Sequence, residues 1–328
     1  MITAIADGSQ VAEARRLVGD FARSHGVPED RRGQIAIVVT ELATNLLKHG
    51  GGGNLLADTF DDRDGAGLEL LALDRGPGMA DVERCIGDGF STAGSPGNGL
   101  GAVMRLSDLV RIYSRPGRGT AVMARFLAHQ PKRAPATQIG AAVAPYPGET
   151  VCGDRWAFGY AQAGRTILVA DGSGHGIEAA RAAEVAVRIF HDRIDDPCER
   201  LVEQMHRALM PTRGAAIAVA RIDPVARSVR FVGVGNIAGV LVSDGVARHM
   251  VSNNGTAGHV APRIREFAYA FSGDPLIILH SDGLTPKWDL TTYPGLATQH
   301  PSLIAGMLLR DWRRGRDDAS VVAVRALL

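Results

Sequence analysis

A short segment with two prolines, His129–Thr137, divides the sequence into two parts with different hydrophobic patterns. It has no apolar period, which is typical of a linker between domains. The part before it combines helical periods with two strand pairs, whereas short strand-like runs dominate the part after it. A chain of 328 residues is about twice the length of a ~150-residue domain. We therefore predict two domains, residues 1–127 and 138–328, joined by a linker at 128–137.

Charge and cysteine content exclude several classes of protein. Lys and Arg number 36 against 35 Asp and Glu, a net charge of +1, which argues against a nucleic-acid binder driven by bulk charge. The 3 cysteines are too few and too scattered for a disulfide framework or a zinc site. Asp7 and Glu13 stand where a signal peptide would be apolar, and no apolar run approaches the ~18 residues of a membrane span. We expect a cytoplasmic protein with no nucleic-acid or membrane partner.

The first part is predicted to be an α/β unit with an antiparallel sheet. A glycine-rich stretch from Asp74 to Gly101 interrupts its elements, and we expect it to form one long, mobile loop. The expected helices are Val11–Ala22, Arg31–Lys48 and Ala102–Leu109. The expected strand pairs are Asn54–Phe60 with Leu68–Leu73, and Val110–Ser114 with Thr120–Leu127.

Two polar patterns in this part carry chemistry. Glu41 and Asn45 are four residues apart, so they share one face of the predicted helix. A carboxylate there can accept a proton, and an amide oxygen beside it can hold Mg²⁺ that is shared with phosphates. Asp74 ends an apolar strand and precedes Gly76 and Gly78, so it can accept a hydrogen bond from an exocyclic amine. Taken singly, these patterns also fit a solvated helix face and an ordinary turn.

A third pattern, Gly97-Asn98-Gly99-Leu100-Gly101, precedes a predicted helix. Free N–H groups and the helix dipole can cradle phosphates there, although a flexible capping loop has the same pattern. In order and spacing, ELATNLLKHG, LDRGPGM, GNGLG and the final GRGTAVMARF resemble the GHKL (Bergerat-fold) ATPases. The resemblance is closest to the RsbT/RsbW branch of serine kinases, the RsbT type in particular, and covers about Ala12 to Leu127.

This resemblance implies an ATP site that uses Mg²⁺, on a mixed sheet with helices on one face. Glu41 would be the base that orients the acceptor hydroxyl, and Asn45 would be the Mg²⁺ ligand. Asp74 would contact the adenine amine, with Gly76 and Gly78 under the base. The residues implied to cradle the phosphates are Gly97, Gly99 and Gly101, and the implied ATP lid runs from about Ala80 to Pro96.

The second part is predicted to be a layered, sheet-on-sheet core flanked by helices. The expected helices are Gly176–His191, Pro197–Leu209 and a segment near Pro301–Trp312. The expected strands are Ile139–Ala144, Trp156–Ala163, Thr166–Ala170, Ala215–Asp223, Ser228–Val234, Ala238–Val242, Leu276–His280 and Ser320–Ala326.

Acidic residues stand at strand ends or turns in this part, at Asp154, Asp171, Asp282 and the pair Asp317–Asp318. Carboxylates that converge repel one another unless a cation lies between them. Ligation by oxygen alone favours Mg²⁺ or Mn²⁺, and two such ions can activate a water for in-line attack on phosphorus. Each Asp-Gly pair taken singly also fits an ordinary turn.

As a set, VCGD, ADGSGHG, LHSDGLT and RDDAS resemble the PPM-type serine/threonine phosphatases, and the SpoIIE/RsbX branch most closely, from about Thr137 to Leu327. The resemblance implies an α-β-β-α sandwich, so the whole chain is expected to be α+β with two domains. Asp171 would bridge two Mn²⁺ or Mg²⁺ ions, and the Gly172 carbonyl would be the next ligand. Asp282 and Asp317 would hold the second metal, with Asp318 as the alternative to Asp317, and Asp154 would complete the cluster.

Two further polar residues keep alternative roles. His175 either serves as a proton donor or phosphate contact, or hydrogen-bonds within its own turn. Asn236 resembles an asparagine of the family that has a structural or a substrate-side role.

Together the two resemblances predict a bifunctional switch, an ATP-dependent Ser/Thr protein kinase fused to a metal-dependent Ser/Thr phosphoprotein phosphatase. The implied partner is a STAS-domain protein, either an anti-sigma antagonist or an RsbS- or RsbR-like stressosome scaffold. One alternative is that the first part only binds and sequesters a regulator of a sigma-factor pathway, so that the phosphatase is the sole enzyme. Another is that ATP bound to the first part gates the phosphatase.

Overall fold

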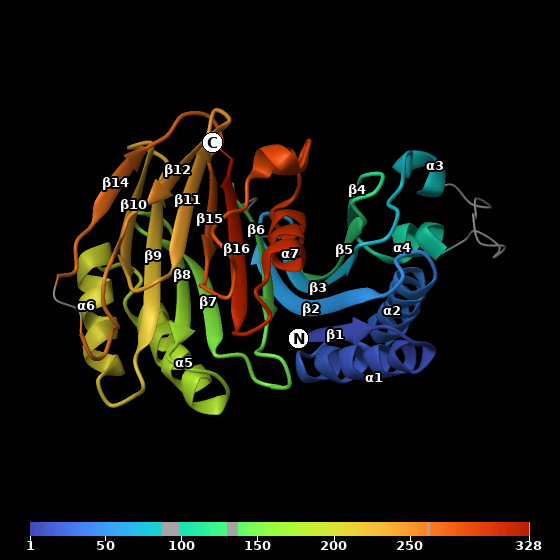
Figure 1. The fold of residues 1–328 in the computed structure, drawn as a ribbon, viewed down its shortest axis with the longest axis horizontal. Helices are drawn as coiled ribbons and strands as arrows, with labels where there is room; N and C mark the ends of the chain where they lie inside the picture. Colours follow the sequence, from blue (N-terminus) through green and yellow to red (C-terminus); the bar gives the residue numbers. More distant parts are fainter. Residues whose placement is uncertain (87–98, 130–136, 261–262, 328) are drawn as a thin grey trace. The chain divides into compact units, whose positions relative to one another are not determined.

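The computed structural model describes residues 1–86, 99–129, 137–260 and 263–327 (Figure 1). By packing, the chain divides into two compact units. The first unit combines Met1–Pro135 with Tyr293–Arg310, and the second combines Ala136–Thr292 with Asp311–Leu328. The segment Tyr293–Arg310 therefore packs with the first unit, although it lies within the second part of the sequence. The predicted domains, residues 1–127 and 138–328, do not include this exchange.

The first unit is built on one five-stranded sheet with the strand order β1-β2-β3-β5-β4. Its described pairings are all antiparallel, as the strand patterns predicted, so the sheet is not mixed. Its strands are β1 (Ile2–Ile5), β2 (Gly53–Asp62), β3 (Gly65–Asp74), β4 (Leu109–Ser114) and β5 (Thr120–His129). Its helices are α1 (Gly8–Ser24), α2 (Glu29–Lys48), α3 (Val82–Ile86), α4 (Gly99–Leu106) and most of α7 (Pro301–Trp312).

One face of this sheet forms the main core of the unit with α1 and α2. Leu68, Leu70 and Ala72 of β3 belong to the same buried cluster as Val38 and Leu42 of α2. Because side chains alternate along a strand, these three residues share one face of β3. Helix α1 begins at a capping box in which Asp7 accepts from the Gln10 N–H and Gln10 reaches back, so its direction is fixed locally.

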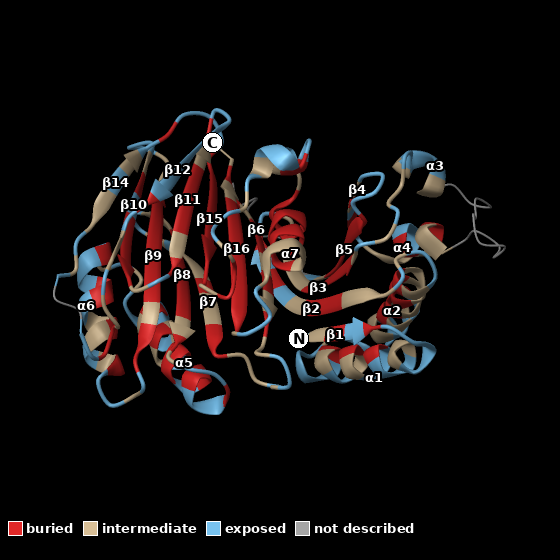
Figure 2. Cartoon of the chain, in the orientation of Figure 1, coloured by how far each residue is buried: buried red, intermediate tan, exposed pale blue. Residues whose placement is uncertain are grey.

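The opposite face of the sheet is covered by α7. Glu69, Leu71 and Leu73 alternate with the residues of the first face, and Leu71 and Leu73 are buried. Gly306 of α7 lies against them, because a Cβ atom added there would stand 2.6 Å from Leu71 Cδ2 and 2.9 Å from Leu73 Cδ2. Figure 1 shows α7 across β2 and β3 from α1 and α2, and Figure 2 shows it as buried. The expectation of helices on one face is thereby corrected.

A buried ion network holds this second face together. The Arg125 guanidinium donates from Nε to Glu69 Oε2 at 2.7 Å and from Nη1 to Asp62 Oδ1 at 2.9 Å. It also lies 4.0 Å from the centre of the Phe60 ring. Burial would lower the pKa of Arg125, but the charges of Glu69 and Asp62 raise it above its usual range. Arg125 therefore stays charged inside the protein, and its partners are obligatory.

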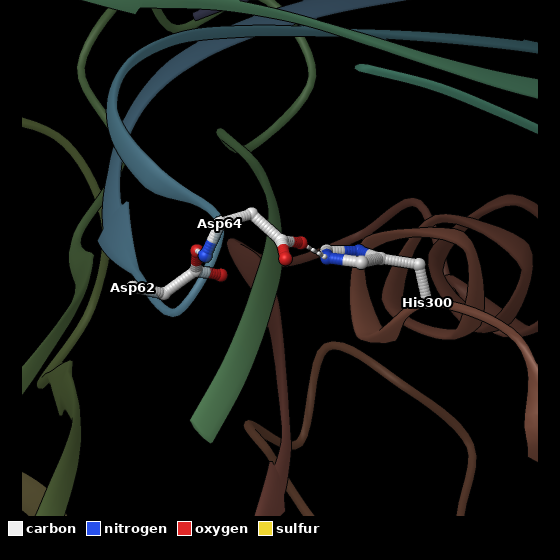
Figure 3. Close-up of side chains that lie close together, drawn as sticks. All are labelled: Asp62, Asp64 and His300. Atoms are coloured by element: carbon white, nitrogen blue, oxygen red, sulfur yellow. Dashed lines mark hydrogen bonds and ion pairs between the residues drawn. The ribbon is translucent and has the colours of Figure 1, made fainter. Parts of the chain in front are cut away.

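The chain just before and within α7 completes the network. Ser302 Oγ donates to Glu69 Oε2 at 2.7 Å, and the Ser302 N–H donates to His300 Nδ1 at 3.2 Å. Since Nδ1 accepts that bond, the ring proton belongs on Nε2, which lies 3.2 Å from Asp64 Oδ2. Figure 3 shows His300 and Asp64 pointing toward each other. The ligand atoms of Asp62, Asp64 and His300 lie within 4.8 Å of one another, but Arg125 already supplies the cation.

The second unit consists of two packed sheets. One has the order β13-β10-β9-β8-β7 with β14 on β10, and the other has the order β12-β11-β15-β16-β6. Their facing side chains, such as Ile167, Phe231 and Leu279, form a buried cluster. Helices α5 (Ile177–Asp192) and α6 (Cys198–Leu209) cover the outer face of the first of these sheets. This arrangement confirms the predicted sheet-on-sheet core with flanking helices.

The strands of this unit agree with the predicted runs to within a few residues at their ends. The predicted strands are β6 (Thr137–Ala144), β7 (Asp154–Ala161), β8 (Gly164–Gly172), β9 (Ala215–Asp223), β10 (Ser228–Val234), β11 (Ala238–Ser243), β15 (Leu276–His280) and β16 (Ala319–Ala326). The short edge strands β12 (Val246–Met250), β13 (Ser252–Asn253) and β14 (Phe267–Ala270) were not predicted. Two 3₁₀ turns complete the description, at Leu290–Thr292 and Leu296–Thr298.

Within the described ranges, the helices are too short or too polar to cross a lipid bilayer.

The Arg125 network generates a stability prediction. Replacement of Arg125 by Ala leaves Asp62 and Glu69 buried without their cation, and we expect a loss of about 3–5 kcal/mol. Hydrogen exchange at the amides of β3 and β5 in the full chain measures this loss. Arg111→Ala on β4, an exposed arginine, serves as the control and should change stability by no more than ~0.5 kcal/mol. An equally small change in Arg125→Ala would contradict the network's role.

Candidate active sites

The first candidate site lies where α2 meets the start of α4. Glu41 and Asn45 lie one turn apart on α2, as predicted, and both are half-buried. Gly99, the first residue of α4, lies directly against them. A Cβ atom at Gly99 would stand 2.8 Å from Glu41 Oε2 and 3.6 Å from Asn45 Oδ1. The fold therefore brings together two motifs that are far apart in sequence, and Gly99 leaves room there for the Glu41 side chain.

Asp74 ends β3 and is held by the loop that follows it. Its Oδ1 accepts from the Gly76 N–H at 2.8 Å and from the Thr120 N–H at 3.1 Å. Burial raises the pKa of the Asp74 carboxyl, whereas these two hydrogen bonds lower it. The backbone packs tightly here, because a Cβ atom at Gly76 would stand 2.6 Å from the His49 carbonyl oxygen. A half-buried carboxylate in this setting can accept a hydrogen bond from an amine of a ligand.

The remaining first-site predictions fall partly outside the described residues. Gly97 and most of the predicted lid at 80–96 lie there, although α3 (Val82–Ile86) is described at the start of the lid. Gly78 has φ +69°, which favours glycine, and it packs against the Arg115 backbone. Gly101 is buried within the first turns of α4. The free N–H groups of this helix start are available to an anion.

The second candidate site lies at the ends of β7 and β8. Asp154 and Asp171 face each other in register across these two strands. Asp154 is 1% exposed, and its two carboxylate oxygens have no hydrogen-bond partner among the described residues. Burial raises the pKa of Asp154 to about 6, a rise that the nearby Ser281 and Ser320 hydroxyls oppose and that repulsion from Asp318 and Asp317 supports. Burial of a charged carboxylate without hydrogen-bond donors destabilises a protein unless a cation lies beside it.

Asp171 stands at the centre of this acidic site. Burial raises its pKa well above the usual range, and repulsion from the four other acidic residues of the site adds to the effect. Those residues are Asp154, Asp282, Asp317 and Asp318. The fold thus brings together every predicted acidic ligand. Gly172, the remaining predicted ligand, packs against the Ala179 backbone so closely that a side chain has no room.

Asp317 and Asp318 differ in their surroundings. Asp318 is buried, accepts from the Tyr146 N–H through Oδ1 at 2.7 Å, and has no partner for Oδ2 among the described residues. Gly153 makes room for it, because a Cβ atom there would stand 2.7 Å from Asp318 Oδ2. Asp317 is half-buried, and its pKa is raised by burial and then by Asp282. Asp317 is thus the more exposed of the two and is repelled by Asp282, whereas Asp318 is buried and held by the Tyr146 N–H.

Two residues with open roles now have defined contacts. Asn236 Nδ2 donates to Asp282 Oδ2 at 2.7 Å, which orients one carboxylate of the acidic site. His175 Nδ1 lies 3.0 Å from Glu149 Oε1, and its ring stacks on Tyr146 at 4.3 Å between centres. The Asn236 contact joins residues far apart in sequence, so no local pattern could have revealed it.

The acidic residues fit a pair of divalent cations. Carboxylates and a backbone carbonyl are the oxygen ligands that Mg²⁺ and Mn²⁺ prefer. The unpartnered oxygens of Asp154 and Asp318 and the repulsion around Asp171 are the features that such cations would remove.

This electrostatic arrangement predicts opposite effects of one substitution with and without metal. Asp171→Asn removes a repelled charge, so the metal-free chain should melt at a higher temperature than the wild type. With Mn²⁺ the order should reverse, because the variant loses a central ligand. Thermal unfolding with Mn²⁺ and with a chelator checks both signs, and Asp274→Asn, outside the acidic site, is the control. Equal stabilisation of wild type and variant by Mn²⁺ would contradict the assignment.

The Asn236 contact predicts a positioning effect on the same site. Asn236→Ala should raise the Mn²⁺ concentration needed for half-maximal stabilisation by about tenfold, because an outer-shell partner orients its ligand. Asn254→Ala, at an exposed asparagine elsewhere in the unit, should leave the Mn²⁺ requirement unchanged. An unchanged requirement in Asn236→Ala would show that Asp282 needs no such support.

Two family models match different parts of the chain. The histidine kinase-like ATPase domain family matches residues 5–126, and the stage II sporulation protein E (SpoIIE) family matches residues 162–327. Serine/threonine-protein kinase RsbT of Bacillus subtilis (strain 168) is 35% identical over 114 residues, covering 35% of this chain and 86% of RsbT.

Two solved structures share the fold. One comes from work on the bacterial stressosome as a modular system adapted to control secondary messenger signalling, with TM-score 0.54, 26% identity and coverage of 58% of this chain and 99% of that chain. The other is RsbX in complex with magnesium, with TM-score 0.52, 16% identity and coverage of 66% and 99%. The description of the first family implies a nucleotide site within residues 5–126. The chain belongs to the SpoIIE family, and it joins a domain of that family to a histidine kinase-like ATPase domain related to RsbT.

Proposed function

We propose that the chain is a bifunctional regulatory switch, in which a Ser/Thr protein kinase and a metal-dependent Ser/Thr phosphoprotein phosphatase act on STAS-domain partners. One observation carries this proposal. The same chain gathers Glu41, Asn45 and Gly99 at one site and four acidic residues around Asp171 at another. The first set suits transfer of a phosphoryl group to a hydroxyl, and the second suits its removal.

In the kinase reaction, we assign Glu41 as the base. It accepts the proton of the acceptor hydroxyl, whose oxygen then bonds to the γ-phosphorus of ATP while ADP leaves. Asn45 would hold Mg²⁺ beside the phosphates, and Gly99 with Gly101 would bind them through backbone N–H groups. Asp74 would accept from the adenine amine. The similarity of the first unit to RsbT and the contact between Glu41 and Gly99 support these roles.

In the phosphatase reaction, we assign the acidic residues as ligands of two Mn²⁺ or Mg²⁺ ions. Asp171 would bridge them with the Gly172 carbonyl beside it, Asp282 and Asp317 would hold the second ion, and Asp154 would complete the cluster. When bound, such ions lower the pKa of a water and neutralise charge on phosphate. Asn236 keeps Asp282 aimed at the site, and Asp318 anchors the Tyr146 backbone.

The partner assignment follows from the relatives. RsbT is a serine/threonine kinase, and a structure similar to the second unit comes from work on the bacterial stressosome. We therefore propose a STAS-domain protein of the RsbS or RsbR type, or an anti-sigma antagonist, as the substrate of both activities. Two opposed activities in one chain would set the phosphorylation level of a shared target, since tethering raises their local concentration. The requirement for ATP and phosphoprotein substrates places this work in the cytoplasm.

The kinase assignment is tested by phosphotransfer. Purified full chain, Mg²⁺ and radiolabelled ATP are incubated with a panel of purified STAS-domain proteins, and Glu41→Gln should lower the transfer rate by about 10²-fold or more. ATP affinity should change little, because the base does not hold the nucleotide. Glu13→Gln, on the exposed side of α1, is the matched control.

The phosphorylated product is then offered to the full chain with Mn²⁺. Release of phosphate that Asp171→Asn abolishes would establish the second activity. Binding of a STAS protein without transfer in the wild type would instead favour a sequestering module attached to a phosphatase. Release of phosphate at the same rate in a chelator would contradict the metal-dependent phosphatase.

A further inference from the structure

The segment Tyr293–Arg310 is the part of the second sequence half that packs into the first unit. Its beginning is fixed at Pro294, whose carbonyl oxygen accepts from Arg115 Nη2 at 2.8 Å and from Tyr113 Oη at 3.3 Å. Its middle is fixed by Ser302, bonded to Glu69, and by Gly306, packed on Leu71. These contacts attach the segment to β3, β4 and the turn before β5.

The end of the segment contacts Asp74 and Arg75, at the end of β3 in the first candidate site. The Arg310 guanidinium donates from Nη1 to the Asp74 carbonyl oxygen, and the Arg75 guanidinium donates to the Arg310 carbonyl oxygen. A Cβ atom at Gly119 would stand 2.8 Å from Arg310 Nη1, so glycine leaves room for this contact. Arg310 thus holds the backbone of the residue whose side chain is assigned to adenine.

The same segment is closed at its base within the second unit. The Thr285 N–H donates to the Trp312 carbonyl at 3.0 Å, and the Arg314 N–H donates to the Gly283 carbonyl at 2.8 Å. We call this pairing of Gly283–Thr285 with Trp312–Arg314 the neck. It lies directly after Asp282 and just before Asp317 in the chain. Gly283 packs on the Asp318 backbone with no room for a side chain, so the neck lies directly against one residue of the acidic site.

We propose that the Gly283–Arg314 loop couples the two sites, with Arg310 as the positioning residue through which ATP at Asp74 changes the phosphatase rate. A ligand that bonds to the Asp74 carboxylate shifts or tightens the β3 end that Arg310 holds. That displacement passes along α7 to the neck, whose two segments adjoin Asp282 and Asp317 in the chain. The inference rests on the proposed ATP site. It requires ATP to bind at that site, but it does not require any phosphoryl transfer between the two sites.

The test uses the full chain carrying Glu41→Ala, so that ATP binds without being consumed. ATP affinity is measured by calorimetry, and the phosphatase rate is measured on p-nitrophenyl phosphate at fixed free Mn²⁺. GTP is the matched nucleotide control, since it chelates Mn²⁺ like ATP but lacks the adenine amine. We expect ATP, and not GTP, to change the rate by about twofold or more, a modest coupling of the usual size.

Arg310→Ala in this background should bind ATP about tenfold more weakly, the loss of one charge-assisted hydrogen bond. Its phosphatase rate should no longer respond to ATP, even when ATP saturates the variant. Arg310→Lys keeps a donor for the Asp74 carbonyl and should restore part of the response. Arg16→Ala, an exposed arginine on α1, should respond like the parent chain.

The outcomes separate the coupling from the proposed function. If the parent chain binds no ATP, both fail. If it binds ATP and the rate does not change, the coupling fails and the ATP site stands. An undiminished response in Arg310→Ala would overturn the role of Arg310. Should that variant fold poorly, hydrogen exchange of the parent chain decides, because ATP must alter exchange at the amides of Ser302–Arg310, and unaltered exchange would overturn the proposal.

Discussion

The buried charge of Arg125 is the constraint on which much of the first unit depends. A guanidinium at 0% exposure needs fixed acceptors, and Asp62 of β2 and Glu69 of β3 provide them. These carboxylates in turn need cover from water, which Ser302 and the rest of α7 provide. The second face of the sheet is therefore complete only with a segment from the other half of the sequence. Covalent continuity then links that face to the loops of the acidic site.

At both sites a charged side chain lies close to the backbone of another segment. A glycine stands beside a charged side chain at each site, Gly99 beside Glu41 and Gly153 beside Asp318. The two sites differ in electrostatics. Asp74 has backbone donors that offset the cost of its burial, whereas Asp154 has none and Asp171 is surrounded by like charges. The first site is thus prepared for a hydrogen-bonding ligand, and the second for cations.

Most elements were predictable because their hydrophobic periods are long and regular. The covering of the second face of the first sheet by a helix was not predicted, although the sequence of β3 indicated that this face is buried. Its sequence GAGLELLALD places apolar residues on both faces of the strand. A strand with one solvent-exposed face would instead alternate apolar and polar residues. The two-residue β13 and the exposed β12 lack such periods, since edge strands need little burial to form.

By itself, the sequence determined the helices, the principal strands and the motifs from Glu41 to Asp318, because these depend on local periodicity and on the chemistry of short segments. It also favoured Asp317 as a ligand but could not separate it firmly from Asp318. Only the tertiary structure decided which residues meet across long separations: Asn236 with Asp282, Gly99 with Glu41, and Arg310 with Asp74. The reason is physical. Such contacts depend on how whole faces of helices and sheets pack against one another. The packing of α7 with the first unit follows from this and is not indicated by any residue pattern within α7.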